Sequence, residues 1–125
     1  GRDMDCIFCS LPAARIEAED ALTLTIRDGF PVSPGHTLVI SRRHIASLFD
    51  TTAEEGAALF AAVRSARARL DAEVAPDGYN IGVNVGEAAG QSVLHLHVHV
   101  IPRYRGDTPR PRGGVRHVIP CKGDY

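Results

Sequence analysis

Long apolar runs and a charge excess are both absent from this sequence. No stretch of the 125 residues approaches the roughly 20 apolar residues of a transmembrane helix, so a membrane-spanning protein is not expected. The first residues have neither the basic nor the apolar part of a secretory signal peptide, and we therefore expect a cytoplasmic protein. The formal net charge of -1 at pH 7 argues against a general polyanion binder.

Cysteine is also scarce. The chain has three cysteines, an odd number, and two of them are spaced as Cys6-x-x-Cys9. Without an export signal, this spacing favours a metal-binding or redox pair over a disulfide framework. Cys121 has no ligand-like partner near it in the sequence, and we interpret it as incidental.

The composition that remains is that of an ordinary globular protein. Hydrophobic residues make up 44% and charged residues 23% of the chain. Because no internal repeat or linker divides it, we predict one domain over residues 1–125. Residues 103–125, its C-terminal segment, are rich in arginine, glycine and proline and have no regular periodicity.

The hydrophobic pattern predicts five short strands and one long helix. The strands are expected over residues 15–19, 21–27, 36–41, 79–85 and 94–101. The helix is expected over about residues 52–74, opened by a capping box between Thr52 and Glu55. Its apolar stripe is expected to contain Leu59, Val63, Ala66 and Leu70, with Phe60 and Val74 beside it. Connections too short for parallel crossovers favour an α+β fold with an antiparallel sheet.

The last predicted strand carries three histidines, His95, His97 and His99, that alternate with aliphatic residues. Successive side chains of a strand point to opposite faces, so the three imidazoles are expected on one face, about 7 Å apart. A solvent-facing polar row is the alternative, but such rows are normally filled by Thr, Lys, Glu or Arg. Near neutral pH, histidine acts as a nucleophile, proton shuttle or metal ligand, and the row therefore predicts a reactive site.

Three segments of the sequence resemble the histidine triad (HIT) family. Residues 95–101 (HLHVHVI) fit the family signature at every position. Residues 84–93 (NVGEAAGQSV) resemble its phosphate-binding loop, and residues 34–40 (PGHTLVI) resemble another of its segments. The resemblance covers about residues 6–105. It implies a HIT-like antiparallel sheet of about five strands, one long helix and a short N-terminal helix.

The resemblance also implies nucleotidyl transfer to histidine. Family members cleave a nucleoside monophosphate from a leaving group, as in dinucleoside polyphosphates or adenosine phosphoramidates. His97 would attack the α-phosphorus and form a covalent nucleotidyl-histidine, from which water would release the monophosphate. A neutral imidazole is a competent nucleophile when an acceptor orients its other nitrogen, and we expect a backbone carbonyl as that acceptor.

The other site residues follow from the same resemblance. His99 would bind phosphate oxygens or assist the leaving group, and His36 would support the triad. The phosphate or the leaving group would be contacted by Asn84, Gly90, Gln91 and Ser92. Donors held beside the phosphorus stabilise the charge of the transition state.

Nucleoside binding leaves alternatives open. Asp28 lies where the family places a residue that holds the ribose hydroxyls, but Asp before Gly29 is also typical of a turn. Ile7, Phe8 and Ile26 are candidates for the apolar slot of the base, although core packing is the commoner fate of such residues.

Cys6 and Cys9 have the spacing of a zinc half-site. In bacterial-type HIT proteins that the chain resembles, a Cys2His2 zinc is completed by residues that correspond to His44 and His95. Four protein ligands leave no position for water, so this zinc would be structural, and catalysis would fall to His97 and His99. The alternative is a metal-free pair of thiols. Magnesium is a further candidate cofactor with a polyphosphate substrate.

The C-terminal segment concentrates positive charge, with five arginines and one acid in residues 103–116. It is either a flap over the distal phosphates of the substrate or plain solvated surface. A nucleic-acid patch is disfavoured because only Tyr104 interleaves the arginines. Some family members place an aromatic residue from this segment near the active site, for which His117 or Tyr125 is the candidate here. The family resemblance implies a homodimer.

Several functions are compatible with these features. The leading prediction is a nucleotidyl hydrolase or transferase that acts on small-molecule nucleotides. A dinucleoside polyphosphate phosphorylase and a nucleotide-binding regulator with little turnover are the alternatives. A zinc-ribbon-like interaction module is disfavoured, because its ligands would spread from Cys6 to His95 within one fold.

Overall fold

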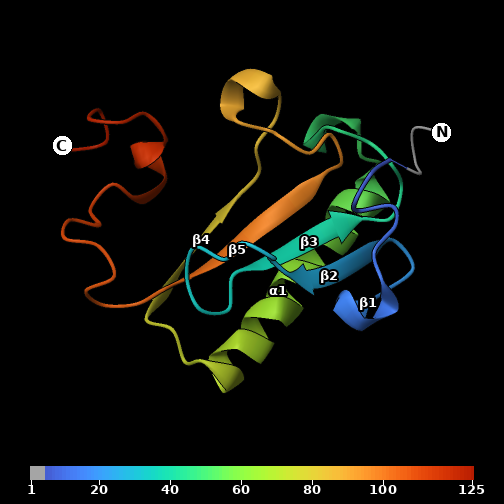
Figure 1. Ribbon diagram of the computed structural model, residues 1–125, viewed down its shortest axis with the longest axis horizontal. Coiled ribbons are helices and arrows are strands. Elements are labelled where there is room, and N and C mark those ends of the chain that lie inside the picture. The colour runs from blue at the N-terminus through green and yellow to red at the C-terminus, as the bar shows by residue number, and fades with distance from the viewer. Residues whose placement is uncertain (1–4) are drawn as a thin grey trace.

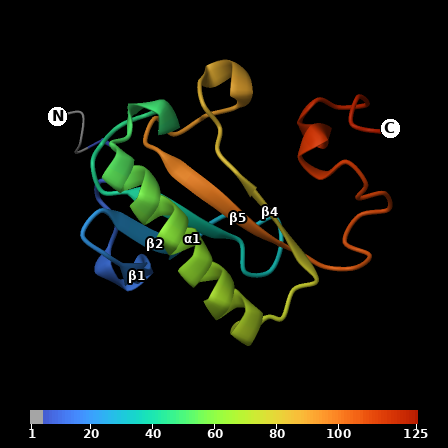
Figure 2. The ribbon, with the colours of Figure 1, turned by 180° about the vertical axis from the view of Figure 1, so that it is seen from behind.

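The computed structural model describes residues 5–125 and contains one antiparallel sheet with a long helix across one face (Figures 1 and 2). The helix is α1 (Ala53–Glu73). The five strands are β1 (Ile16–Glu19), β2 (Thr23–Arg27), β3 (Thr37–Ser41), β4 (Gly78–Gly82) and β5 (His97–Arg103). Their order in the sheet is β1-β2-β3-β5-β4. The predicted α+β class and five-stranded antiparallel sheet are therefore confirmed.

Three predicted elements differ from the structure, and one of them is the fourth strand, which ends at Gly82 instead of residue 85. The predicted short N-terminal helix is a single 3-10 turn, Ala13–Arg15. Pro12 directly precedes this turn, and β1 begins directly after it. The last strand begins at His97 instead of residue 94, because the backbone N–H of Leu96 donates to the Ile45 carbonyl (2.7 Å), outside the strand ladder. This strand also continues two residues beyond the predicted end, to Arg103, and its Pro102 lies opposite Tyr79 of β4.

Helix α1 begins with the predicted capping box. Thr52 Oγ1 accepts from the Glu55 N–H (3.0 Å), and Glu55 Oε1 accepts from the Thr52 N–H (2.8 Å). Arg43 donates two hydrogen bonds to the Glu55 carboxylate, at 2.9 and 2.8 Å. These bonds, with those of the cap, lower the pKa of Glu55 to about 2. The start of the helix is thereby fixed to the loop that follows β3.

Apolar residues are buried on both faces of the sheet. Alternate residues of β3 point to opposite faces, and Val39 packs with Leu59 and Leu70 of α1. Leu38 and Ile40 pack with Phe8 and Ile26 on the other face, and every residue of β3 is buried. Phe60, expected beside the buried stripe of α1, is instead 64% exposed. The face without the helix is covered by the N-terminal segment, and the candidate site lies there.

The C-terminal segment extends beyond β4, as Figures 1 and 2 show. Its first residue, Arg103, ends β5, and the residues after it contain one 3-10 turn, Gly114–Val118, and no strand of the sheet. In the part of the chain that is described, we find no helix with the length and apolarity needed to cross a bilayer.

Candidate functional site

A cavity of about 670 Å³ lies over the sheet face that α1 leaves free. This volume falls within the usual range for a small-molecule site. Nine of the residues predicted to form the site line it: Ile7, Phe8, Ile26, Asp28, Asn84, Gly90, Ser92, His97 and His99. The structure thus brings the predicted base slot, ribose residue and phosphate loop to one place, although Ile26 and Phe8 also belong to the core.

His97 is oriented by the backbone. Its Nδ1 lies 2.7 Å from the carbonyl oxygen of His95. A carbonyl oxygen only accepts, so Nδ1 carries the proton and Nε2 keeps its lone pair. The expected backbone acceptor is therefore present, and the ring offers a nucleophilic nitrogen on a strand that holds it firmly.

His36 and His99 form a second oriented pair. The Val32 N–H donates to His36 Nδ1 (3.1 Å), which places the His36 proton on Nε2. His36 Nε2 then donates to His99 Nδ1 (3.0 Å), which leaves the His99 proton on its own Nε2. His99 is thus prepared to donate a proton or hydrogen bond, whereas His97 beside it, with ring centroids 5.2 Å apart, is prepared to attack.

Asp28 and burial set the charge of this pair. Asp28 Oδ2 is 3.4 Å from His36 Nε2, and its Oδ1 accepts from the Phe30 N–H (2.8 Å). Burial lowers the pKa of His36 below its ordinary 6.5, and the Asp28 carboxylate opposes part of this effect. Burial, then His97 and His36, lower the pKa of His99. Both rings are therefore neutral near pH 7.

Asp28, His36 and His99 also place ligand-type atoms within 4.8 Å of one another. A metal at this point would need a lone pair on His36 Nε2. The Val32 N–H donates to His36 Nδ1, which keeps the ring proton on Nε2. The group is accordingly better suited to moving a proton than to holding an ion.

In the loop before the triad, the Gln91 side chain is bonded to backbone groups of the protein. Its Oε1 accepts from the Gly86 N–H (2.9 Å), and its Nε2 donates to the carbonyls of Ala46 (2.8 Å) and Val93 (3.1 Å). Gln91 is buried and is not among the residues that line the cavity. Its side chain shapes the loop, and Gly90, at φ 92°, supplies a turn that favours glycine. The contact of Gln91 with substrate stays a prediction, since its side-chain oxygen and nitrogen are bonded within the protein.

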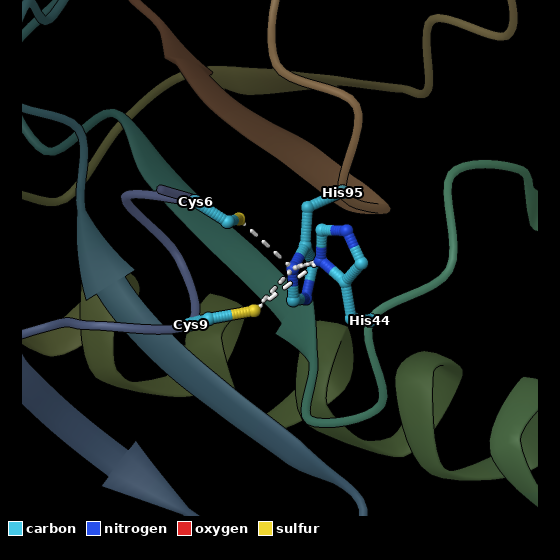
Figure 3. A group of neighbouring side chains, drawn as sticks. All are labelled: Cys6, Cys9, His44 and His95. Carbon is cyan, nitrogen blue, oxygen red and sulfur yellow. Dashed lines mark hydrogen bonds between the residues drawn. The ribbon is translucent and has the colours of Figure 1, made fainter. Parts of the chain in front are cut away.

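His95 lies just before β5, and unlike His97 and His99 it does not line the cavity. Its ring is fully buried and enters a cluster with Cys6, Cys9 and His44 (Figure 3). The two cysteines come from the N-terminal segment, His44 from the loop after β3, and His95 from the approach to β5. Three segments far apart in the sequence therefore meet at this cluster.

The cluster fits a tetrahedral zinc ion. The four ligand atoms lie within 4.8 Å of one another. His95 Nδ1 is 3.3 Å from Cys6 Sγ and 3.1 Å from His44 Nδ1, and Cys9 Sγ is 3.2 Å from His44 Nδ1. Usual Zn–S and Zn–N bonds give tetrahedral edges of about 3.3 to 3.8 Å. His95 Nε2 donates to the Ser41 carbonyl (2.6 Å), so its Nδ1 carries no proton and can act as a metal ligand.

Phe30 and Arg15 are two of the cavity-lining residues that sequence reasoning missed. Phe30, which is 91% exposed, follows Asp28 by two residues, and this spacing was the only local signal. Arg15 reaches the cavity because its guanidinium donates to the Arg27 carbonyl (2.9 Å). Nothing in the local sequence of Arg15 indicated this placement.

The C-terminal segment does not form a flap over the cavity. Among the described residues, none beyond His99 lines it. Arg103 pairs with Asp107, and the Tyr125 ring centroid lies 4.8 Å from the guanidinium carbon of Arg112 and 4.5 Å from that of Arg116. His117 donates to the Arg112 carbonyl (2.7 Å). Neither aromatic candidate of this segment is therefore near the triad.

Comparison with known proteins agrees with this geometry. The sequence profile of the HIT domain matches residues 12–106. The protein named Protein hit of Bacillus subtilis is 42% identical over 108 residues, which are 82% of this chain and 74% of that protein. An AP-4-A phosphorylase of Mycobacterium tuberculosis is 38% identical over 93 residues, 74% of this chain but only 48% of the phosphorylase.

A solved structure of similar fold contains zinc. It is a Zn-bound histidine triad family protein from Mycobacterium smegmatis, with a TM-score of 0.76 and 40% identity. The match covers 85% of this chain and 80% of that one. With the matching profile, the sheet and the triad segment in agreement, the chain belongs to the histidine triad family.

Proposed function

We propose that the protein is a nucleotidyl hydrolase or transferase that works through a covalent nucleotidyl-histidine. Its substrates would be a nucleoside monophosphate joined to a leaving group, of the dinucleoside polyphosphate or adenosine phosphoramidate type. The observation that carries this proposal is the hydrogen bond from His97 Nδ1 to the His95 carbonyl. With its Nδ1–H held by this carbonyl, His97 keeps the lone pair on Nε2 that nucleophilic catalysis requires, and it lines the cavity.

In the first step, His97 Nε2 attacks the α-phosphorus and forms a P–N bond, while the bond from phosphorus to the leaving group breaks. His99 Nε2–H is positioned to donate to a phosphate oxygen or to the departing atom, and His36 holds that tautomer. In the second step, water attacks the same phosphorus, the P–N bond breaks, and a nucleoside monophosphate is released. Asn84, Gly90 and Ser92 line the phosphate end of the cavity.

The nucleoside would occupy the apolar end of the cavity. Ile7, Phe8 and Ile26, which line the cavity, would contact the base, and Asp28, which also lines it, would hold the ribose hydroxyls. Asp28 thus has two functions in this proposal, because the same carboxylate lies 3.4 Å from His36 Nε2. The Cys2His2 cluster would hold zinc as a structural ion that completes the fold around this cavity.

Transfer to phosphate instead of water is the second candidate. It is favoured by the similarity to the AP-4-A phosphorylase of Mycobacterium tuberculosis, although the chain spans about half of that protein. The two reactions differ in the second step alone, so the products formed with and without inorganic phosphate separate them. A nucleoside diphosphate among the products would indicate phosphorolysis.

The experiment that tests covalent catalysis uses His97→Ala and adenosine phosphoramidate. We expect turnover to fall by a factor of about a thousand or more, while AMP still binds, because the cavity lining is otherwise intact. Rapid quenching of the wild type should give a protein heavier by one adenylate, located at His97 by mass spectrometry. If His97→Ala keeps its turnover, or no adduct forms during turnover, the proposed nucleophile is wrong. AMP binding without turnover in the wild type would favour a regulator.

We also propose a single-domain cytoplasmic homodimer. One edge of the sheet is β4, whose outer side has no strand partner among the described residues, and Ile81 on it is 43% exposed. Unpaired sheet edges are natural sites for association with a second chain. Magnesium remains a prediction that no observation on this structure favours.

A further inference from the structure

The segment from Cys6 to Cys9 belongs to the metal cluster and to the nucleotide cavity at the same time. Its two cysteines supply sulfur ligands to the cluster. The residues between them, Ile7 and Phe8, line the cavity. The Cys9 N–H donates to the Cys6 carbonyl (3.1 Å), which closes these four residues into a turn. A metal that fixes both sulfurs would therefore also fix the apolar wall between them.

Phe8 links this turn to the nucleophile. It is only 7% exposed, and its ring lies edge-on to His95, with centroids 5.9 Å apart and planes at 89°. The same ring contacts His97, with centroids 5.0 Å apart and planes at 65°. One aromatic side chain is thus packed between a metal ligand and the histidine that would attack phosphorus.

His95 provides a second link. Its Nδ1 belongs to the cluster, and its Nε2 is bonded to the Ser41 carbonyl. Its own carbonyl accepts the Nδ1–H of His97. The ring and the backbone of a single residue therefore join the metal position to the orientation of the nucleophile.

We propose that metal binding and nucleotide binding are thermodynamically coupled through Phe8 and His95, which act as positioning residues. This inference rests on the proposed nucleotide site. Without the metal, no ion joins the cysteines of the 6–9 turn to His44 and His95. Nucleotide binding must then order the apolar wall that Ile7 and Phe8 form in this turn. The cost of this ordering weakens binding. Coupling of this kind is reciprocal, so the nucleotide must strengthen metal binding by the same factor.

The test measures both halves of this cycle with AMP, which the proposed reaction releases and does not consume. Calorimetry gives the Kd of AMP for the zinc-loaded and the zinc-free protein, and competition with a chromophoric chelator gives the Kd of zinc with and without saturating AMP. We expect AMP to bind at least five-fold more tightly to the zinc-loaded form, as in typical coupled sites. AMP should tighten zinc binding by an equal factor. Far-UV circular dichroism reports whether the zinc-free chain is folded.

The Phe8→Ala variant tests the proposed path while keeping all four metal ligands. We expect zinc to bind this variant, but the coupling factor to fall towards one. Phe49→Ala is the matched control, because Phe49 is 82% exposed and does not line the cavity. If the zinc-free chain unfolds, the rate of zinc loss to excess chelator replaces the equilibrium measurement. Saturating AMP should slow this loss in the wild type and Phe49→Ala, and leave it unchanged in Phe8→Ala.

The outcomes separate this inference from the proposed function. Equal AMP affinity with and without zinc overturns the coupling and leaves nucleotidyl transfer standing. Undiminished coupling in Phe8→Ala shows that Phe8 is not the link. If AMP binds neither form, both the nucleotide site and its coupling are wrong.

Discussion

The hydrogen-bond partner of each histidine ring decides what that ring can do. His95, His97 and His99 are the same residue type within five positions, yet their partners differ. A carbonyl holds the proton of His97 on Nδ1, whereas His36 leaves the proton of His99 on Nε2. The neighbouring rings thus acquire opposite abilities, one to attack and one to donate. In His95 the Ser41 carbonyl takes Nε2–H and leaves Nδ1 for a metal.

The lowered pKa values of His36 and His99 predict a pH dependence of stability. The unfolded chain binds protons to these rings near pH 6.5, whereas the folded chain resists protonation because the rings are buried. The unfolded state therefore binds more protons as the pH falls below 6.5, and the free energy of unfolding decreases there. Well above pH 6.5 both rings are unprotonated in the folded and the unfolded state alike, so they no longer make the free energy of unfolding depend on pH.

Urea denaturation between pH 5 and pH 8 measures this effect. The His36→Gln variant should show a shallower fall of unfolding free energy on acidification than the wild type. His117→Gln, a change in the C-terminal segment outside the cavity, should follow the wild-type curve. Parallel wild-type and His36→Gln curves would contradict the assignment of a buried, neutral His36. Any loss of zinc in acid is common to all three proteins and cancels in the comparison.

At the scale of elements, short connections place the functional side chains. The loop between β2 and β3 carries Asp28 at one end and His36 at the other. The Asp28 N–H donates to the His36 carbonyl (2.9 Å), which brings the two ends together. Just before His36, Gly35 has φ 88°, and an added Cβ would lie 2.9 Å from Leu70 Cδ2. The glycine thus allows this loop to lie against the end of α1.

Gly35→Ala should therefore destabilise the fold more than a glycine change made in open space. A left-handed backbone costs an alanine about 1 to 3 kcal/mol, and displacement of Leu70 adds to that cost. Gly106→Ala is the control, because Gly106 has φ 82° but nothing within 4 Å of the added Cβ. Chemical denaturation should give a loss for Gly35→Ala about 1 kcal/mol or more above that for Gly106→Ala. Equal losses would mean that the contact with α1 is unimportant.

At the scale of the whole molecule, the sheet has two unequal sides and two edges. One face is closed by α1, and the other holds the cavity and the metal cluster. The metal cluster joins the N-terminal segment to the sheet, so it completes a wall that the strands alone do not supply. Of the two edge strands, β4 is followed by the loop that carries Asn84 and Gly90 into the cavity.

Association through β4 predicts a particle of twice the 13.4 kDa chain mass. Light scattering coupled to size-exclusion chromatography measures this mass directly. Ile81→Lys should give the single-chain mass, because a charge on the edge strand must be desolvated when a second strand pairs with it. Phe49→Lys, at an exposed site outside the sheet, should leave the mass unchanged. A single-chain mass for the wild type would exclude the proposed homodimer.

Sequence alone determined the features that depend on local periodicity and local chemistry. Alternation identified the strand of His97 and His99 and placed both rings on one face. The Thr52–Glu55 spacing identified the start of α1. Cys6, Cys9, His44 and His95 were grouped by their resemblance to a family, and the structure brings their ligand atoms within 4.8 Å.

Only the tertiary structure decided how these residues are used. Periodicity did not indicate that the His95 ring contacts Cys6, because the two residues are 89 positions apart. It also did not indicate that Gln91 turns to the Ala46 carbonyl, or that His36 fixes the proton of His99 from 63 positions away. Spacing along the chain determines on which face of a strand or helix a side chain lies. The position of a proton depends on which distant donor or acceptor the fold places beside it.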